Sequence, residues 1–248
     1  MQRFFIALAF LTGFLNSVKA QQNIFNVPTS ELTRRHQFII QQQINVSGQE
    51  LQSNTTFSYG IGRNLELGFN LFNVKGHTRP LGLESNSDPQ KEPLSPFVLL
   101  NAQKGFYLTE WLSLGVGGQY GFHFPENNDV RVGAYAYGNL ITELPKLNTR
   151  LITGLYHADR TLFGPGYRND FFLRPPGLGI QLGFEQPLFH NKLLLVADYM
   201  GGTHSYGAAT AGLDFRIQKK LELAVGYQFP NPYSAASEGL IFQFTLLP

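Results

Sequence analysis

The chain has 248 residues and no cysteine, which excludes disulfide bonds, thiol catalysis and zinc sites built on thiolates. Arg3 and Lys19 belong to the first twenty positions, which hold no acid, so the other residues keep 17 of the 19 Lys and Arg against 17 Asp and Glu. This neutral balance gives no electrostatic footprint for nucleic acid, which we therefore exclude as a partner.

Residues 1–20 have the pattern of a secretory signal peptide. Arg3 supplies a positive n-region, residues 4–14 are mostly apolar, and residues 18–20 end in the small-residue pattern of a cleavage site. The apolar run is too short for a membrane-spanning helix, which needs about 20 residues. We expect residues 21–35 to form a short periplasmic segment and residues 21–248 to form one outer-membrane β-barrel domain.

The rest of the chain alternates apolar and polar residues with period two, as half-buried strands do. We predict an all-β, antiparallel up-and-down transmembrane barrel of about twelve strands, each close to the roughly 9–11 residues that cross a bilayer. An even number of strands would return both termini to the periplasm. The predicted strands lie near 36–47, 51–61, 65–74, 96–106, 111–122, 130–141, 149–158, 177–187, 192–202, 206–217, 221–229 and 238–247.

Short and long connections alternate between these strands. Tight turns are predicted near 62–64, 109–110, 189–191 and 218–220, with a slightly longer one at 142–148. Longer loops are predicted at 75–95, 123–129, 159–176 and 230–237. Outer-membrane barrels have short periplasmic turns and longer extracellular loops, so the alternation indicates this class.

The polar members of each strand define the face that lines the lumen. Outward positions such as Phe69, Leu100 and Leu182 are apolar, as lipid requires. The inward candidates are Glu66, Asn70, Gln119, Arg131, Tyr135, Gln181, Glu185, Asp198, Asp214, Arg216 and Glu222. Acids outnumber bases in this set, so a water-filled pore would favour cations. In the seventh strand, Arg150 and His157 fall on opposite faces and leave the register open.

The loop at 159–176 combines three arginines with several aromatic residues. Arg160, Arg168 and Arg174 could bind the phosphates of lipopolysaccharide, because a guanidinium pairs well with phosphate oxygens. The aromatic residues of the same loop could instead fold inward and narrow the pore.

Two hairpins resemble a known family. The stretch at 57–68, FSYGIGRNLELG, resembles a hairpin of outer-membrane transporters labelled as meta-pathway phenol degradation-like. The segment at 213–227 is similar to the penultimate hairpin of that family. The resemblance implies a bacterial outer-membrane barrel that transports small molecules, with no catalytic residues to carry over.

The motifs that would indicate an enzyme are weaker than the barrel pattern. A barrel-embedded hydrolase needs a His and a Ser on one strand face, two residues apart, so that the imidazole can take the hydroxyl proton. His204 and Ser205 are adjacent and would point to opposite faces, and His36, His123 and His157 have no serine two residues away. The six histidines show no metal-ligand spacing. We expect no enzyme activity, no cofactor and no metal site.

The sequence therefore predicts a porin-like channel or transporter in the outer membrane of a Gram-negative bacterium, with lipid and lipopolysaccharide as its surroundings. The alternative is a closed structural or interaction barrel that binds lipopolysaccharide or a partner through its outer loops. A soluble secreted β-protein is a third possibility. The solute and the oligomeric state stay open.

Overall fold

The computed structural model describes residues 22–124, 130–165, 177–189 and 192–248. The predicted signal peptide, Arg168 and Arg174 lie outside this part of the chain, as do two residues of the turn expected at 189–191. The strands are β1 (Phe38–Ser47), β2 (Glu50–Gly62), β3 (Leu65–Thr78), β4 (Leu81–Glu84), β5 (Phe97–Tyr107), β6 (Leu112–His123), β7 (Arg131–Leu144), β8 (Thr149–Ala158), β9 (Leu178–Phe189), β10 (Leu193–Met200), β11 (Ala208–Gln218), β12 (Leu221–Pro230) and β13 (Gly239–Leu246).

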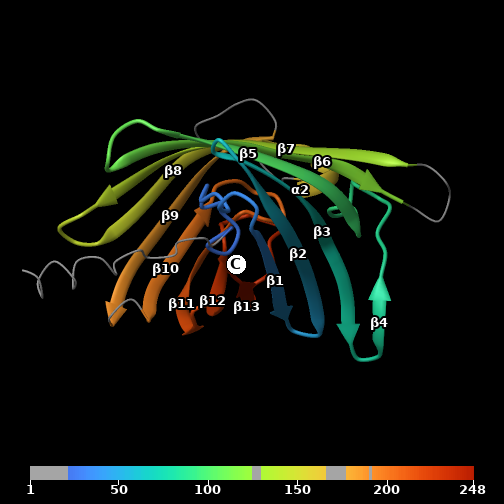
Figure 1. Ribbon diagram of the computed structural model, residues 1–248. Helices are drawn as coiled ribbons and strands as arrows, with labels where there is room; N and C mark the ends of the chain where they lie inside the picture. The colour runs from blue at the N-terminus through green and yellow to red at the C-terminus, as the bar shows by residue number, and fades with distance from the viewer. Residues whose placement is uncertain (1–21, 125–129, 166–176, 190–191) are drawn as a thin grey trace, which may run out of the picture.

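Twelve of these strands close into an antiparallel barrel (Figure 1). Each barrel strand pairs with its neighbours in sequence, β1 pairs with β13, and β2 pairs with β3 to complete the ring. The predicted closed barrel is therefore confirmed. β4 is an extra strand that pairs with β3 alone and extends it beyond the barrel wall as a hairpin. Among the described residues, no helix is long and apolar enough to cross a membrane.

The two ends of the barrel differ in their connections. At one end, which we call the turn end, strands are joined by short turns such as 63–64 and 219–220. The opposite loop end carries the β3–β4 hairpin, the loop before β5, the short helix α2 (Arg160–Phe163) and the connections 201–207 and 231–238. The connection 48–49 is a tight turn at the loop end, because Gly48 takes the left-handed φ of +58° that this turn requires.

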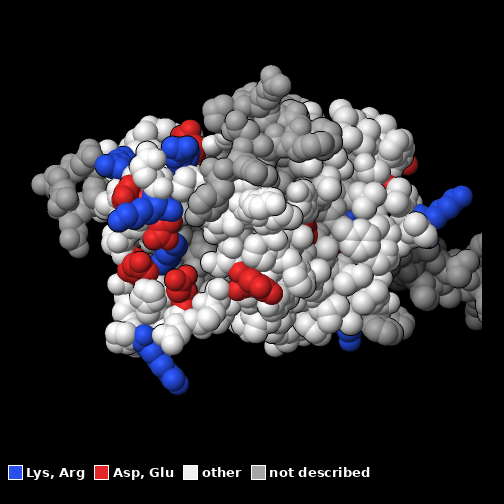
Figure 2. All heavy atoms as spheres, turned by 180° about the vertical axis from the view of Figure 1, so that it is seen from behind, with Lys and Arg blue, Asp and Glu red and all other residues white. Residues whose placement is uncertain are grey.

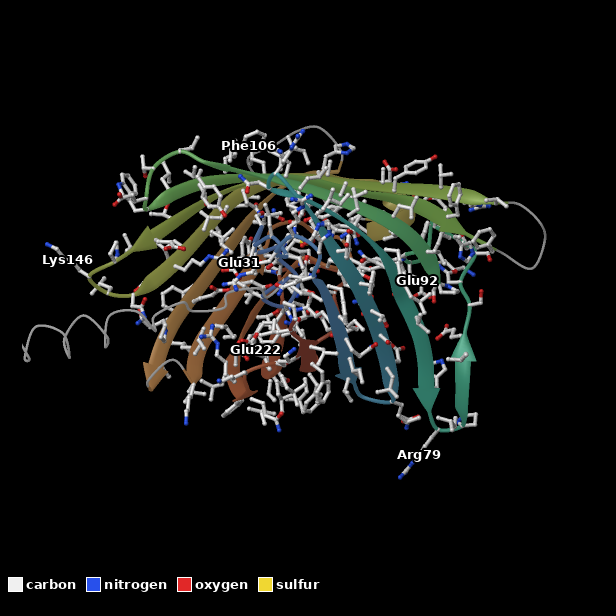
Figure 3. The ribbon with its side chains drawn as sticks, in the orientation of Figure 1. Glu31, Arg79, Glu92, Phe106, Lys146 and Glu222 are labelled. Atoms are coloured by element: carbon white, nitrogen blue, oxygen red, sulfur yellow. The ribbon has the colours of Figure 1, made fainter. Side chains whose placement is uncertain are left out.

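Outward and inward side chains alternate along every barrel strand. Leu100 is 65% exposed and Leu182 is 41% exposed, whereas the neighbouring Gln181 is fully buried. β8 is the seventh strand of the barrel, whose register the sequence left open, and burial settles which face is which. Arg150 points into the barrel, and His157 is exposed on the outside near the loop end of the strand. Figure 3 shows Phe106 on the outside of the wall and Glu31 inside the ring of strands.

The interior contains a chain segment of its own. Residues 22–33, which we call the lumen segment, lie within the barrel, where the blue trace is enclosed by the strands in Figure 1. Ile24, Phe25 and Val27 are buried there against inward residues of β7, β8, β10, β12 and β13. The sequence placed this segment on the periplasmic side, outside the barrel. Its position is different because the apolar contacts of these three residues and many polar contacts are available only inside the wall.

Candidate functional site in the barrel lumen

The lumen segment is a compact turn. The N–H of Ile24 donates to the carbonyl oxygen of Val27 at 3.1 Å, and that of Thr29 donates to Gln22 at 3.0 Å. Asn23 and Pro28 form an isolated antiparallel bridge between these bonds. The segment therefore satisfies part of its backbone internally and presents the remaining peptide groups to the wall.

Asp198 of β10 binds the tip of this turn. One carboxylate oxygen, Oδ2, accepts hydrogen bonds from the backbone N–H groups of Phe25, Asn26 and Val27, at 3.1, 2.6 and 2.9 Å. Three converging N–H dipoles stabilise a buried carboxylate, since hydrogen bonds to an ionised acceptor are the stronger kind. Asp198 was predicted to line a pore, and the structure places it inside the lumen in contact with the segment.

Glu66 of β3 binds both ends of the segment. Its carboxylate accepts hydrogen bonds from the side-chain amide of Gln22 at 3.0 Å and from the backbone N–H of Thr33 at 2.7 Å. Gln103 of β5 donates to the other carboxylate oxygen at 2.9 Å and also to the carbonyl of Glu31 at 2.9 Å. Glu66 therefore joins the two ends of the segment through charge-assisted bonds.

Arg150 is the central cation of the lumen. Its Nη1 lies 3.0 Å from Glu31 of the lumen segment and 2.9 Å from Glu185 of β9, and its Nη2 donates to the carbonyl of Thr29 at 2.8 Å. Sequence reasoning missed Arg150 as a site residue because its face was ambiguous. Its two acidic partners come from different parts of the chain, 119 residues before it and 35 after it, so no local pattern could reveal them.

Neutral amides complete the contact with the segment. Gln243 of β13 donates to the carbonyls of Asn23 and Ile24 at 3.0 and 2.9 Å. Asn139 of β7 donates to Pro28 at 2.8 Å. The wall thus offers carboxylates to the N–H groups of the segment, and amides or a guanidinium to its carbonyls.

Glycines of the wall make room for the side chains of the segment. Gly212 of β11 and Gly226 of β12 are paired in register, and a Cβ atom on either would lie 2.9 or 2.6 Å from Cζ of Phe25. A Cβ on Gly183 would lie 2.7 Å from Cδ1 of Ile24. Real Cβ contacts are longer, so a side chain on Gly226 or Gly183 would displace the segment. A Cβ on Gly212 would also lie 2.2 Å from the carbonyl oxygen of Val225, so the wall itself requires glycine there. Paired inward glycines next to an apolar segment before the first strand are the signal that could have predicted this packing.

Other predicted lumen residues lie around the segment. Asn70 and Gln119 border two cavities of about 20 and 60 Å³, which hold a few water molecules at most. The Tyr135 hydroxyl donates to Gln181 at 2.9 Å, and Gln181 donates to Asn139 at 2.5 Å. Arg131 is half-buried at the loop end of β7, in register with His123. The lumen is therefore nearly filled in this structure.

The remaining predicted acids lie toward the turn end. Arg216 and Glu222 are register partners in β11 and β12, and Nε of Arg216 lies 3.0 Å from Oε1 of Glu222. Asp214 is buried one inward position away, and its two carboxylate oxygens have no hydrogen-bond partner among the described residues. Figure 3 shows Glu222 inside the barrel below Glu31.

Aromatic packing covers part of the loop end. Phe163 of α2 stacks on Tyr135 at 5.3 Å, and its ring lies 4.9 Å from both His204 and Tyr206. Burial lowers the pKa of His204 to about 4, so this ring is neutral at pH 7. Phe163 thus folds inward, as one of the two expectations for this loop had it, and the other aromatic residues of the loop lie outside the described part of the chain. Arg160 remains exposed and donates to Gln90 at 3.3 Å.

A polar pocket of about 380 Å³ opens at this end, between β1 to β3 and the loops before β5, β11 and β13. It is lined by amides and hydroxyls, including Gln52, Asn73, Tyr206 and Gln228. Figure 2 shows acidic and basic side chains side by side over the end that carries β4, next to a largely uncharged wall. In the β3–β4 hairpin and the loop before β5, Lys75 pairs with Glu92 and Lys91 with Asp88, and Nε2 of His77 lies 2.9 Å from Oε2 of Glu84.

Ser87 and His123 form a hydrogen bond that sequence spacing did not predict. The Ser87 hydroxyl lies 3.1 Å from Nε2 of His123, and Nδ1 of the same ring donates to the carbonyl of Pro96 at 2.8 Å. Serine hydrolases stabilise the imidazolium that forms during catalysis with a carboxylate at this third position. A neutral carbonyl offers no such compensation to the buried His123, so the contact ties the loop to β6.

We therefore expect Ser87 to be unreactive toward fluorophosphonate probes. The measurement is mass spectrometry of the folded protein after labelling, with Ser87→Ala as the control and a known serine hydrolase as the positive standard. Labelling that disappears in Ser87→Ala would contradict this expectation and indicate a nucleophilic serine.

Comparison with known proteins places the fold. No protein-family model and no curated protein matches the chain. The KdgM porin in complex with disordered oligogalacturonate is 10% identical, with a TM-score of 0.54 over 84% of this chain and 98% of that one. A second structure of the KdgM porin is 9% identical, with a TM-score of 0.52 and the same coverage. The chain has the fold of an outer-membrane porin. This likeness concerns the fold and supports the expected localisation in the outer membrane.

The apolar outer face gives a test of that localisation. Leu182 lies near the middle of β9 on the outside, and Leu188 lies on the same face near the turn end. We expect Leu182→Arg to cost about 2–4 kcal/mol in the free energy of unfolding from lipid vesicles, and Leu188→Arg about 0–1 kcal/mol, since the penalty falls toward the interface. Equal costs at the two positions in equilibrium urea unfolding would mean that this face does not contact lipid.

Proposed function

We propose that the protein is an outer-membrane channel that passes small polar molecules through the barrel lumen. The observation that carries the proposal is the chemistry of the inner wall. Where the wall contacts the lumen segment it uses carboxylates, amides and a guanidinium, which water can solvate equally well once the segment leaves. A barrel filled permanently would gain more from an apolar interior, because buried ion pairs contribute little net stability.

The solute class follows from the charge of the wall. Glu66, Glu185, Asp198, Asp214 and Glu222 outnumber the inward arginines 131, 150 and 216. Rings of carboxylates attract cations and repel anions, so the route favours cationic or neutral polar solutes. The porin fold and the two hairpins that resemble meta-pathway phenol degradation-like transporters support a transport role. The turn end would then face the periplasm and the loop end the exterior.

The test is a single-channel recording of the refolded mature protein in a planar bilayer. We expect long closed periods, because the lumen segment fills the route, interrupted by discrete openings. The closed barrel that binds lipopolysaccharide through its outer loops, with Arg160 at the loop end, is the alternative outcome. Two results together would favour this closed barrel. The wild type and the variants that loosen the segment would all fail to conduct, and lipopolysaccharide would bind the wild type more tightly than Arg160→Ala.

A further inference from the structure

The contacts inside the barrel are those of a receptor with its ligand. Wall side chains bind the main chain of the lumen segment: Asp198 takes three N–H groups, Glu66 takes one more, and amides and Arg150 donate to carbonyls. Main-chain contacts of this kind recognise a peptide in one backbone conformation, whatever its side chains. In these contacts, each hydrogen-bond acceptor of the wall faces an N–H group of the segment, and each donor faces a carbonyl.

Side-chain pockets add specificity to this backbone recognition. The ring of Phe25 fills the notch formed by Gly212 and Gly226, and Ile24 packs beside Gly183. Val27 belongs to the same buried cluster as Leu194 and Val196. A peptide with polar residues at these positions would lose the apolar contacts, each worth about a tenfold or greater change in affinity on full burial.

Removal of the predicted signal peptide would leave the segment with one covalent connection to the barrel. Residues 34–37 join it to β1 at the turn end, where the N–H of His36 donates to Gly60 at 2.8 Å and that of Gln37 donates to Arg34 at 3.0 Å. Its internal turn means that it binds as a pre-ordered unit, which lowers the entropy lost on binding. The segment can therefore leave and return as a whole while the barrel stays closed around an emptied lumen.

We propose that the inner wall is a peptide-binding site, that residues 22–33 are its tethered ligand, and that this ligand competes with solute for the lumen. The site takes a short peptide folded as a turn, with an aromatic residue at the position of Phe25 and aliphatic residues at those of Ile24 and Val27. This proposal rests on the lumen being the solute route of the proposed function, but binding of the peptide does not depend on conductance.

The experiment uses the full mature chain with its apolar anchors removed by Ile24→Ser and Phe25→Ser, so that the wall is unchanged. A fluorescent synthetic peptide with the sequence of residues 22–33 is added to this variant in detergent and in bilayers. We expect saturable binding by fluorescence anisotropy and a dose-dependent block of conductance. A scrambled peptide is the control, and Asp198→Asn in the same variant should weaken binding by about tenfold or more.

A crosslink gives a second measurement on a chain with an intact segment. The side-chain amide of Asn26 lies 3.2 Å from the hydroxyl of Thr210, and the protein has no cysteine of its own. A short bifunctional methanethiosulfonate reagent should join Asn26→Cys to Thr210→Cys in folded protein, because each cysteine thiolate displaces a sulfinate and forms a disulfide with the linker. The crosslink should abolish openings, and its reduction should restore them.

The outcomes separate the two proposals. Equal binding of native and scrambled peptides, or failure of the crosslink in folded protein, overturns the peptide site even if the channel conducts. Specific binding without any conductance supports the peptide site and overturns the channel.

Discussion

Replacing Gly226 with leucine is expected to release the lumen segment and increase the open probability of the channel. The new side chain would occupy the notch that holds the ring of Phe25, where even a Cβ would lie 2.6 Å from Cζ. Loss of this burial costs about 1.5–3 kcal/mol, which shifts the equilibrium between the bound and released segment about 10- to 100-fold. The measurement is single-channel open probability, together with the rate at which a soluble thiol reagent labels Asn26→Cys.

Two controls accompany this variant. Gly138 lies on the outer face of β7, and nothing lies within 4 Å of a Cβ built there, so Gly138→Leu tests leucine in a strand without touching the segment. Phe25→Ala empties the same notch from the side of the segment and should raise the open probability by a similar factor. Open probability that changes equally in Gly226→Leu and Gly138→Leu would contradict the assigned role of the notch.

Removing the negative charge of Asp214 is expected to lower the cation preference of the open channel. Asp214 is buried in the lumen with both oxygens unpaired, in contrast to Glu222, which is bound to Arg216. A unit charge attracts a cation about 4 Å away by about 1 kcal/mol in water and repels an anion by the same amount, so Asp214→Asn should reduce the cation-to-anion permeability ratio by up to about 30-fold. Asp214→Asn is combined with Phe25→Ala, which raises the open probability, and is compared with Phe25→Ala alone. The measurement is the reversal potential in a salt gradient.

Glu110→Gln in the same background is the matched control. Glu110 lies in the exposed turn between β5 and β6, outside the lumen, and its neutralisation removes the same charge. The effect of Asp214→Asn should also shrink at high ionic strength, because salt screens charges in a wet pore. An unchanged reversal potential in Asp214→Asn would remove this acid from the ion route.

Much of the wall could be predicted from sequence because side-chain direction in a strand follows residue parity. Glu66, Asp198 and Asp214 were assigned to the lumen on alternation alone, and burial places all three inside. Arg150 and His157 show the limit of this reasoning, because two polar residues of opposite parity gave no choice of face. The partners of Arg150 decide it, and they come from the lumen segment and from β9.

Loops were harder to predict than strands. The connection at 75–95 was expected as a plain loop, yet β3 continues to Thr78 and pairs with β4. Beyond this hairpin the chain folds back, where the side chain of Asn73 donates to the carbonyl of Leu94 at 2.8 Å and Ser95 donates to Asn73 at 2.7 Å. These contacts join residues about twenty positions apart through single side chains, so no repeating pattern records them.

The sequence by itself determined the number of barrel strands and the face of nearly every strand residue, because each depends on a period of two along the chain. The export signal stays a prediction. Only the tertiary structure decided what fills the barrel. The lumen segment has no periodicity, and the residues that hold it, from Gln41 to Gln243, lie between 18 and 220 positions away from their partners in it. Such a site exists only after ring closure brings the inner faces of all the strands together around one small volume.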